Sequence, residues 1–217
     1  MLTKILSSLF CLLFTQAVFA QSMMDEVRSI QVEWAHIKYE LDEDAKSDAF
    51  EALIRKSDAL IKSNPGKAEP LIWSAIVYSS YAGAVGGLKS VTRALPAVKR
   101  ARDLLLESEA INPRALNGSA ATSLGALFYQ VPGWPLGFGN KETARNYLEK
   151  SLEINPDGLD SNFFYGDFLL ERKEYQKAVE VLEHALAAPT LENRPIADQG
   201  RRDEIRKRLQ EAKTHLS

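Results

Sequence analysis

The side chains that most often perform catalysis or bind metal ions are few and scattered in this sequence. Its three histidines, His36, His184 and His215, do not lie at the spacing of a recognised metal motif from one another or from a carboxylate. The sequence also lacks the nucleophile motif G-x-S-x-G and the phosphate-binding P-loop. The segment Gly137–Gly139 lacks the third glycine of a dinucleotide fingerprint, and no predicted strand precedes it. We therefore predict a non-catalytic protein without a metal ion or cofactor.

Composition excludes two further classes of protein. The 217 residues carry 27 Lys and Arg against 29 Asp and Glu, a net charge of -2. Proteins that coat nucleic acid are usually strongly basic, so we predict no nucleic-acid partner. The single cysteine, Cys11, permits neither an intrachain disulfide nor a zinc site built from cysteines.

The first twenty residues have the pattern of a secretory signal peptide. Lys4 provides a positive start, Ile5–Phe14 is an apolar run too short to span a bilayer, and Val18 and Ala20 occupy the small-residue positions before a cleavage site. The alternatives are an uncleaved anchor or a buried first helix. We expect cleavage after Ala20 and export to the periplasm.

The expected mature chain, residues 21–217, has no further stretch that could span a membrane. Cys11 lies inside the apolar run and follows a phenylalanine, whereas lipid attachment requires a small residue before the cysteine. We therefore predict a soluble periplasmic protein without a lipid anchor.

Three Asn-Pro pairs, at Asn64, Asn112 and Asn155, mark a repeat. Before the second and third pairs, an alanine lies twelve residues ahead of the proline, a leucine eight ahead and a serine five ahead. These spacings place the three side chains on one face of a helix, and proline ends that helix. Each copy is therefore predicted to be the second helix of a helical pair.

The spacing resembles the tetratricopeptide repeat (TPR) family, whose pattern runs W-x2-L-G-x2-Y and then A-x3-F-x2-A before a proline. The last copy matches best, with Tyr165, Gly166, Leu169, Ala178 and Leu182 at pattern positions. The resemblance implies an all-α, right-handed superhelical solenoid of about four helix pairs and a C-terminal capping helix. The single domain of residues 21–217 would then consist of repeats at about 31–67, 70–115, 118–158 and 159–192, and a cap at 197–216.

Small residues at the family's packing positions should allow one helix to approach another closely. These are Ala101, Gly125, Ala144, Gly166 and Ala178. The capping helix has an apolar stripe that includes Ile205 and Leu209, and we expect it to cover the open end of the stack. Its other face, with Arg201 and Arg202, is predicted to be a solvated face; the alternative is a helix that binds anions or membranes.

The resemblance also implies that the first helix of each pair lines a concave face. The positions that would point into this groove hold hydroxyl, aromatic, amide and carboxylate side chains: Ser74, Tyr78, Tyr81, Ser119, Thr122, Tyr129, Gln130, Asp160, Phe163 and Asp167. Tyrosine and phenylalanine provide large contact areas at low entropic cost. Two interpretations stay open for the aromatic members, which either bind a partner in the groove or pack inside the stack.

Two insertions depart from the 34-residue pattern. The second repeat holds about 12 extra residues, with glycines at Gly86 and Gly87, and the third holds 7, in the segment QVPGWPLGFGNKE. Extra residues in a solenoid gather at one edge, which is often the binding edge. Trp134 and Phe138 are costly to leave in water, so they either hold the loop against the helices or contact a partner.

The function that best fits these features is a periplasmic scaffold that presents a groove and insertion loops to a protein partner or a small ligand. A weaker resemblance to the TPR proteins that accompany TRAP-type transporters offers an alternative, an accessory subunit of solute uptake. A purely protein-binding adaptor of envelope assembly is a further alternative. An all-helical enzyme is another, and it would be favoured if Tyr78, Tyr129, Asp167 and Trp134 lined one deep enclosed cavity with a charged centre.

Overall fold

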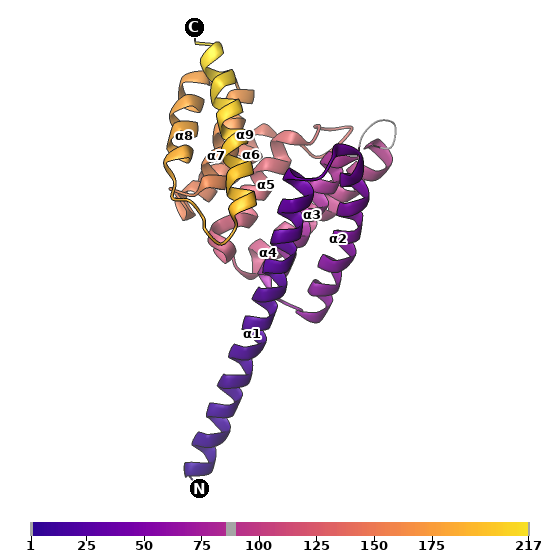
Figure 1. Cartoon of the computed structure of the whole chain (residues 1–217), viewed down its shortest axis with the longest axis vertical. Helices are drawn as coiled ribbons and strands as arrows, with labels where there is room; N and C mark the ends of the chain where they lie inside the picture. Colours follow the sequence, from indigo (N-terminus) through magenta and orange to yellow (C-terminus); the bar gives the residue numbers. More distant parts are fainter. Residues whose placement is uncertain (1, 86–89, 217) are drawn as a thin grey trace.

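A computed structural model describes the backbone of residues 2–85 and 90–216, and the side chains of residues 21–85 and 92–216. The predicted signal peptide, residues 1–20, lies outside the described side chains. The described part contains α-helices, one π-helical turn and one 3-10 turn (Figure 1). None of its helices is both long and apolar enough to cross a membrane.

The helices of the described residues confirm the predicted all-α fold, with four antiparallel pairs and a terminal helix. They are α1 (Leu2–Tyr39), α2 (Glu43–Ser63), α3 (Ala68–Ala84), α4 (Leu95–Ile111), α5 (Ser119–Gln130), α6 (Lys141–Ile154), α7 (Leu159–Glu171), α8 (Tyr175–Ala187) and α9 (Pro195–Thr214). Each helix packs against the next one along the chain, which gives the stacked arrangement visible in Figure 1.

The three Asn-Pro pairs end the second helices of the first three pairs. Asn64, Asn112 and Asn155 are the C-cap residues of α2, α4 and α6. The backbone N–H of Asn112 donates to the carbonyl of Ser108 at 2.9 Å, and that of Asn155 to the carbonyl of Ser151 at 2.9 Å. The following proline has no N–H and cannot continue the helix, so the chain turns toward the next pair.

Small residues stand where the helices of a pair come closest. A Cβ atom on Gly125 would lie 2.6 Å from Leu148 Cγ, and one on Gly166 would lie 2.7 Å from Leu182 Cγ. The repeat alanines Ala101, Ala144 and Ala178 are fully buried. At these points a larger side chain would push the second helix away from the first.

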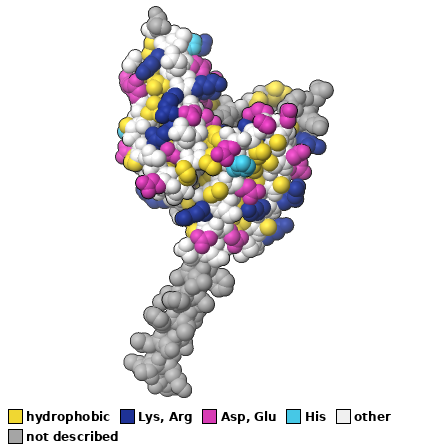
Figure 2. Space-filling model, viewed as in Figure 1, with side chains coloured by type: hydrophobic (Ala, Val, Ile, Leu, Met, Phe, Trp, Pro, Cys, Tyr) yellow, Lys and Arg dark blue, Asp and Glu magenta, His cyan; other side chains and the backbone are white. Residues whose placement is uncertain are grey.

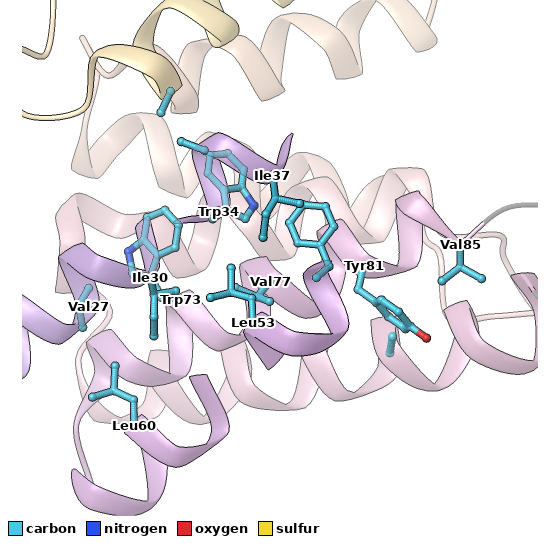
Figure 3. Packing of buried hydrophobic residues seen from close by; sticks show 14 residues of the cluster. Val27, Ile30, Trp34, Ile37, Leu53, Leu60, Trp73, Val77, Tyr81 and Val85 are labelled. Atoms are coloured by element: carbon cyan, nitrogen blue, oxygen red, sulfur yellow. The ribbon is translucent and has the colours of Figure 1, made fainter. Parts of the chain in front are cut away.

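The first helix begins earlier than the repeat spacing indicates. Spacing places the first repeat at residue 31, but α1 is already helical through residues 21–30. In that stretch Met23, Val27 and Ile30 are buried because their spacing continues the apolar stripe of the helix. Figure 3 shows Val27 and Ile30 in one cluster with Trp34 and residues of α2 and α3.

The first helices of the four pairs and the terminal helix α9 contact one another in a ring. Contacts run from α1 to α3, α5, α7 and α9 in turn, and α9 also contacts α1 (Figure 1). A Cβ atom on Gly200 of α9 would lie 2.4 Å from the ring of Tyr39 in α1. Ala197 of α9 lies in the same core cluster as Trp34. The terminal helix therefore covers the last pair, as predicted, and also reaches back to the first.

Candidate functional site

The insertion loop, residues 131–140, connects α5 to α6 and has a closely held backbone. The N–H of Gly139 donates to the carbonyl of Pro132 at 3.0 Å, and the N–H of Asn140 donates to the carbonyl of Phe128 at 2.8 Å. The Asn140 side chain then caps α6 by accepting from two backbone N–H groups of its first turn. Hydrogen bonds thus hold both ends of the loop together.

Glycine is required inside this loop because the backbone segments approach so closely. A Cβ atom would lie 1.9 Å from the carbonyl oxygen of Val131 at Gly139, and 2.4 Å from that of Pro132 at Gly137. Such distances leave no room for a side chain. The loop therefore has a compact backbone that does not depend on a bound partner.

The two aromatic residues of the insertion loop have different environments. The Phe138 ring packs edge-on against Phe128, with centroids 5.5 Å apart, and the Arg102 guanidinium lies 4.7 Å from the Phe138 centroid. Trp134 is 89% exposed, and Leu136 nearby is 71% exposed. Phe138 therefore holds the loop against α4 and α5, whereas Trp134 holds nothing and projects into solvent. The other insertion candidates, Gly86 and Gly87, lie outside the described residues.

Figure 2 shows basic and acidic side chains interspersed over the face that carries α1 and α9, with hydrophobic side chains between them. This mixture agrees with a net charge of -2. This face therefore has no broad patch of positive or of negative charge that could attract a partner.

Two groove candidates are bonded to each other. The Tyr129 hydroxyl donates to Oδ2 of Asp167 at 2.5 Å, and Nε of Arg208 lies 2.7 Å from Oδ1 of the same carboxylate. Burial, and next the Asp167 charge, raise the pKa of Tyr129 well above its usual value. Burial also raises the pKa of Asp167, although the Tyr129 hydrogen bond and the Arg208 charge oppose it.

The other groove candidates also have partners within the fold. The Tyr78 hydroxyl donates to Oδ2 of Asp58 at 2.9 Å, and burial together with this carboxylate raises the pKa of Tyr78 to about 12. Thr122 shares a buried hydrogen bond of 2.5 Å with Ser151. Tyr81 and Phe163 are only 8% and 6% exposed. Both rings pack in core clusters of the stack, and their contact with a partner stays a prediction.

The predicted solvated face of the terminal helix is corrected at Arg201, whereas Asp203, Arg206 and Lys207 are exposed as predicted. Arg201 is 6% exposed, and its Nε donates to Oδ1 of Asp160 at 2.8 Å. The Arg194 guanidinium holds Oδ2 of the same carboxylate at 2.9 Å. Burial opposes ionisation of Asp160, but the Arg201 and Arg194 charges outweigh it and lower the pKa of Asp160 to about 2. The Arg201 guanidinium also lies 4.3 Å from the Phe163 ring centroid.

A polar contact joins α9 to α1. Nζ of Lys38 lies 3.1 Å from Oε1 of Glu204, and the Tyr39 hydroxyl donates to Oε2 of Glu204 at 3.3 Å. Arg201 also pairs with Glu204. Burial and the nearby Arg201 charge lower the pKa of Lys38.

Sequence reasoning missed this role of Arg201, although two signals were present. Arg201 lies four residues before Ile205, so it continues the buried stripe of α9. Arg201 and Arg208 of α9 are seven residues apart, as are Asp160 and Asp167 of α7. A spacing of seven keeps side chains on one helical face over two turns, so the two rows match in period.

The described residues give no arrangement typical of a catalytic centre. His36 lies 2.7 Å from Glu40 and His184 lies 3.1 Å from Asp157, both in exposed pairs. No group of three or more potential metal ligands occurs among the described residues. Tyr129 and Asp167 do meet, but Tyr78 bonds to Asp58 elsewhere and Trp134 is in solvent. These four side chains therefore do not share one enclosed cavity, the arrangement that would favour the enzyme alternative.

Comparison with known proteins agrees with this architecture. A model of the tetratricopeptide repeat family matches residues 137–157, and comparison with curated proteins gives no match. Among solved structures, the thermophilic TPR protein TTC0263 of Thermus thermophilus has a TM-score of 0.58 and 13% identity, over 93% of this chain and 94% of that chain. The crystal structure of MamA has a TM-score of 0.45 and 18% identity, over 81% of this chain and 93% of that chain. The likeness to TTC0263 extends over almost the whole length of both chains, so this chain has the fold of a TPR solenoid.

Proposed function

We propose that the chain is an exported, non-catalytic scaffold that binds a protein partner through its insertion loop. The observation that carries this proposal is the exposure of Trp134 and Leu136 on a loop whose backbone is already fixed. Large apolar side chains are usually removed from water, and tryptophan is enriched among the residues that dominate protein interfaces.

The rigidity of the insertion loop favours binding. Gly137 and Gly139 allow the close backbone contacts, and Phe138 holds the loop against the helices, so the loop loses little conformational freedom when a partner arrives. A binding element with a fixed conformation avoids much of the entropic cost of association. Trp134 and Leu136 can therefore contribute their apolar contact with little cost of ordering the loop.

The cellular location in this proposal rests on residues 1–20. Their short basic start, apolar run and small residues before Ala20 support export and cleavage. Fractionation of cells that express the full chain, with sequencing of the mature N-terminus, tests this part. Retention in the cytoplasm with an intact N-terminus would contradict it.

Cross-linking of the full chain in the cells that produce it tests the binding element. We expect a reproducible protein partner whose yield falls strongly in the double variant Trp134→Ala with Leu136→Ala. The matched control is Arg206→Ala, an exposed substitution on α9 whose side chain pairs only with the neighbouring Asp203 in the described contacts. The control should retain the partner.

Three outcomes would contradict the proposal. If the double variant and the wild type recover equal amounts of partner, the loop is not the contact. Purified chain that binds lipid vesicles through Trp134, with no protein partner, would instead identify a membrane surface. A solute that raises the melting temperature, again with no cross-linked protein, would favour the solute-uptake alternative.

A further inference from the structure

The two exposed apolar side chains of the insertion loop lie on one tight turn. The backbone N–H of Leu136 donates to the carbonyl of Gly133 at 3.1 Å, which closes the turn around Trp134. Trp134 and Leu136 are presented to solvent, whereas Phe138, two residues further on, packs on α5. The turn therefore offers a partner a small apolar contact whose position is fixed by the rest of the loop.

Basic side chains gather in the two chain segments that meet beside this turn. The Arg102 guanidinium lies 4.7 Å from the Phe138 centroid, so the insertion loop lies against the N-terminal half of α4. Residues 92–102 and 131–141 contain no aspartate or glutamate. Their five cationic residues are Arg93, Lys99, Arg100, Arg102 and Lys141. The two segments thus carry a local excess of positive charge, although the whole chain has a net charge of -2.

The fold leaves two of these cations without a counter-charge. Lys99 and Lys141 are exposed, and neither forms an ion pair with a carboxylate in the part of the chain that the structure describes. Lys141 is also the first residue of α6, where the positive end of the helix disfavours a cation. Of the carboxylates that border the two segments, Asp103 is paired with Arg102 at 2.8 Å and Glu142 lies in the first turn of α6. Folding therefore does not explain the lysines at these two positions.

The side of α4 next to the insertion loop combines basic and apolar side chains. Lys99, Arg102 and Leu106 share this side, because they are spaced three and four residues apart along the helix. Leu106 is 41% exposed. In protein interfaces an apolar centre is commonly surrounded by a polar rim, and charges at the rim select the partner and speed its association.

We infer that the insertion loop and the adjoining side of α4 form a docking surface for a protein segment that carries both apolar and acidic side chains. Its apolar side chains cover Trp134 and Leu136, and its carboxylates lie beside Lys99 and Lys141. This inference rests on the proposed function and adds the chemistry of the partner.

The two bordering carboxylates favour a protein segment over an anionic membrane. A continuous anionic surface would meet Asp103 and Glu142 as well as the lysines, and repulsion from these carboxylates would oppose its approach. A peptide segment can place its carboxylates beside Lys99 and Lys141 alone.

The test measures binding of short fluorescent peptides to the purified full chain by anisotropy. Three peptide pools share the same leucine, phenylalanine and serine positions and differ only in carrying glutamate, glutamine or lysine at the others. We expect the glutamate pool to bind most tightly and the lysine pool not to bind. The affinity for the glutamate pool should fall as salt is added, because salt screens exposed charges.

Charge reversal locates the binding surface. Lys99→Glu with Lys141→Glu should weaken binding of the glutamate pool on the order of tenfold. The matched control is Lys67→Glu with Lys207→Glu, which changes the net charge equally at two other exposed lysines and should retain most of the affinity. Circular dichroism checks that both variants are folded, and Lys99→Gln with Lys141→Gln, with a smaller loss expected, replaces the first variant if it is not.

Equal binding of the glutamate and glutamine pools would overturn the inference, and so would equal losses in the charge-reversed variant and its control. Binding to phosphatidylglycerol vesicles with no binding of any peptide pool would overturn it in favour of a lipid surface. Glutamate peptides that bind equally well after Trp134→Ala with Leu136→Ala would also overturn it, because the lysines would then act without the loop.

The same measurements separate this inference from the proposed function. If Trp134 and Leu136 are required for partner recovery in cells while the glutamate and glutamine pools bind alike, the loop contact stands and the acidic partner is excluded. If the partner is recovered equally without these two side chains, the loop contact itself fails.

Discussion

The insertion loop and the contact between α7 and α9 place their side chains in opposite ways. In the loop, Trp134 is 89% exposed although it is apolar, whereas on α9 the charged side chain of Arg201 is 6% exposed. Polarity alone therefore does not decide which side chains this fold buries. The partner available at each position decides it: Arg201 meets Asp160 and the Phe163 ring, and Trp134 meets only solvent.

The difference has an energetic consequence. A buried charge that loses its partner keeps the cost of its desolvation, so substitutions in the α7–α9 contact should reduce folding stability. An exposed apolar side chain contributes little to folding, so its substitution should change binding alone. Measurements of folding stability and of partner binding on variants of the two regions test this difference.

Arg201→Ala should cause the largest loss of stability. It leaves Asp160 with Arg194 as its remaining partner and removes the cation from the Phe163 ring, so we expect unfolding to become easier by about 3 kcal/mol. Urea denaturation measures the change. The matched control is Arg206→Ala on the same helix, whose exposed pair with Asp203 should be worth less than about 1 kcal/mol. Equal losses in the two variants would show that Arg201 behaves as a surface charge.

Phe138→Ala should have the next largest effect. The ring is half-buried and contacts Phe128 and Arg102, so its removal should cost about 2 kcal/mol and loosen the insertion loop. Thermal denaturation measures the loss, and hydrogen exchange of the Gly139 and Asn140 amides reports on the loop. Unchanged amide protection would contradict the role of Phe138 in holding the loop.

Acid should weaken the α7–α9 contact through Asp160. Its folded-state pKa is about 2, below the ordinary value of 3.8. The stability that ionised Asp160 contributes is therefore fully present above about pH 4 and is lost as the pH falls toward 2. Asp167 shifts in the opposite direction, because its pKa is raised, so its protonation favours the folded state.

The opposite pKa shifts of Asp160 and Asp167 predict a difference in melting temperature between their asparagine variants, smaller than the effects of Arg201→Ala and Phe138→Ala. Asp160→Asn should have a lower melting temperature than the wild type at neutral pH. The difference between the two melting temperatures should shrink by a few degrees as the pH falls from about 4 to about 2. Asp167→Asn should show no such narrowing. A gap for Asp160→Asn that stays constant over this range would show that its ionisation does not support the contact.

The sequence was sufficient to predict the helical pairs but not the contacts between distant ones. Asn112 and Asn155 end helices for a local reason, since the following proline acts within its own segment, and Gly125 and Gly166 are needed because each faces the second helix of its own pair. The meeting of Arg201 with Asp160 joins residues 41 positions apart in the chain. A repeat pattern fixes the step from one pair to the next, but it does not fix how far the series of helices curves.

The packing of the insertion loop could also not be predicted from the sequence, although its residues are close together in the chain. Trp134 and Phe138 lie in one loop, and their residue types alone leave it open which one packs against the helices. The close backbone contact between Gly139 and Val131 and the capping of α6 by Asn140 set the direction in which the loop turns. Only this turn places Phe138 on Phe128 and leaves Trp134 in solvent.

Trp134→Ala should have the smallest effect on folding. It tests most strictly whether the exposed side chain of the loop serves binding and not stability. Because the ring makes little contact with the fold, its removal should change the free energy of unfolding by no more than about 0.5 kcal/mol. The buried Trp34 and Trp73 should continue to report an intact core by fluorescence. Partner recovery, in contrast, should fall in the same variant. A loss of stability equal to that of Phe138→Ala would mean that Trp134 packs against the fold in solution, and the contrast between an exposed binding residue and a buried structural one within the loop would disappear.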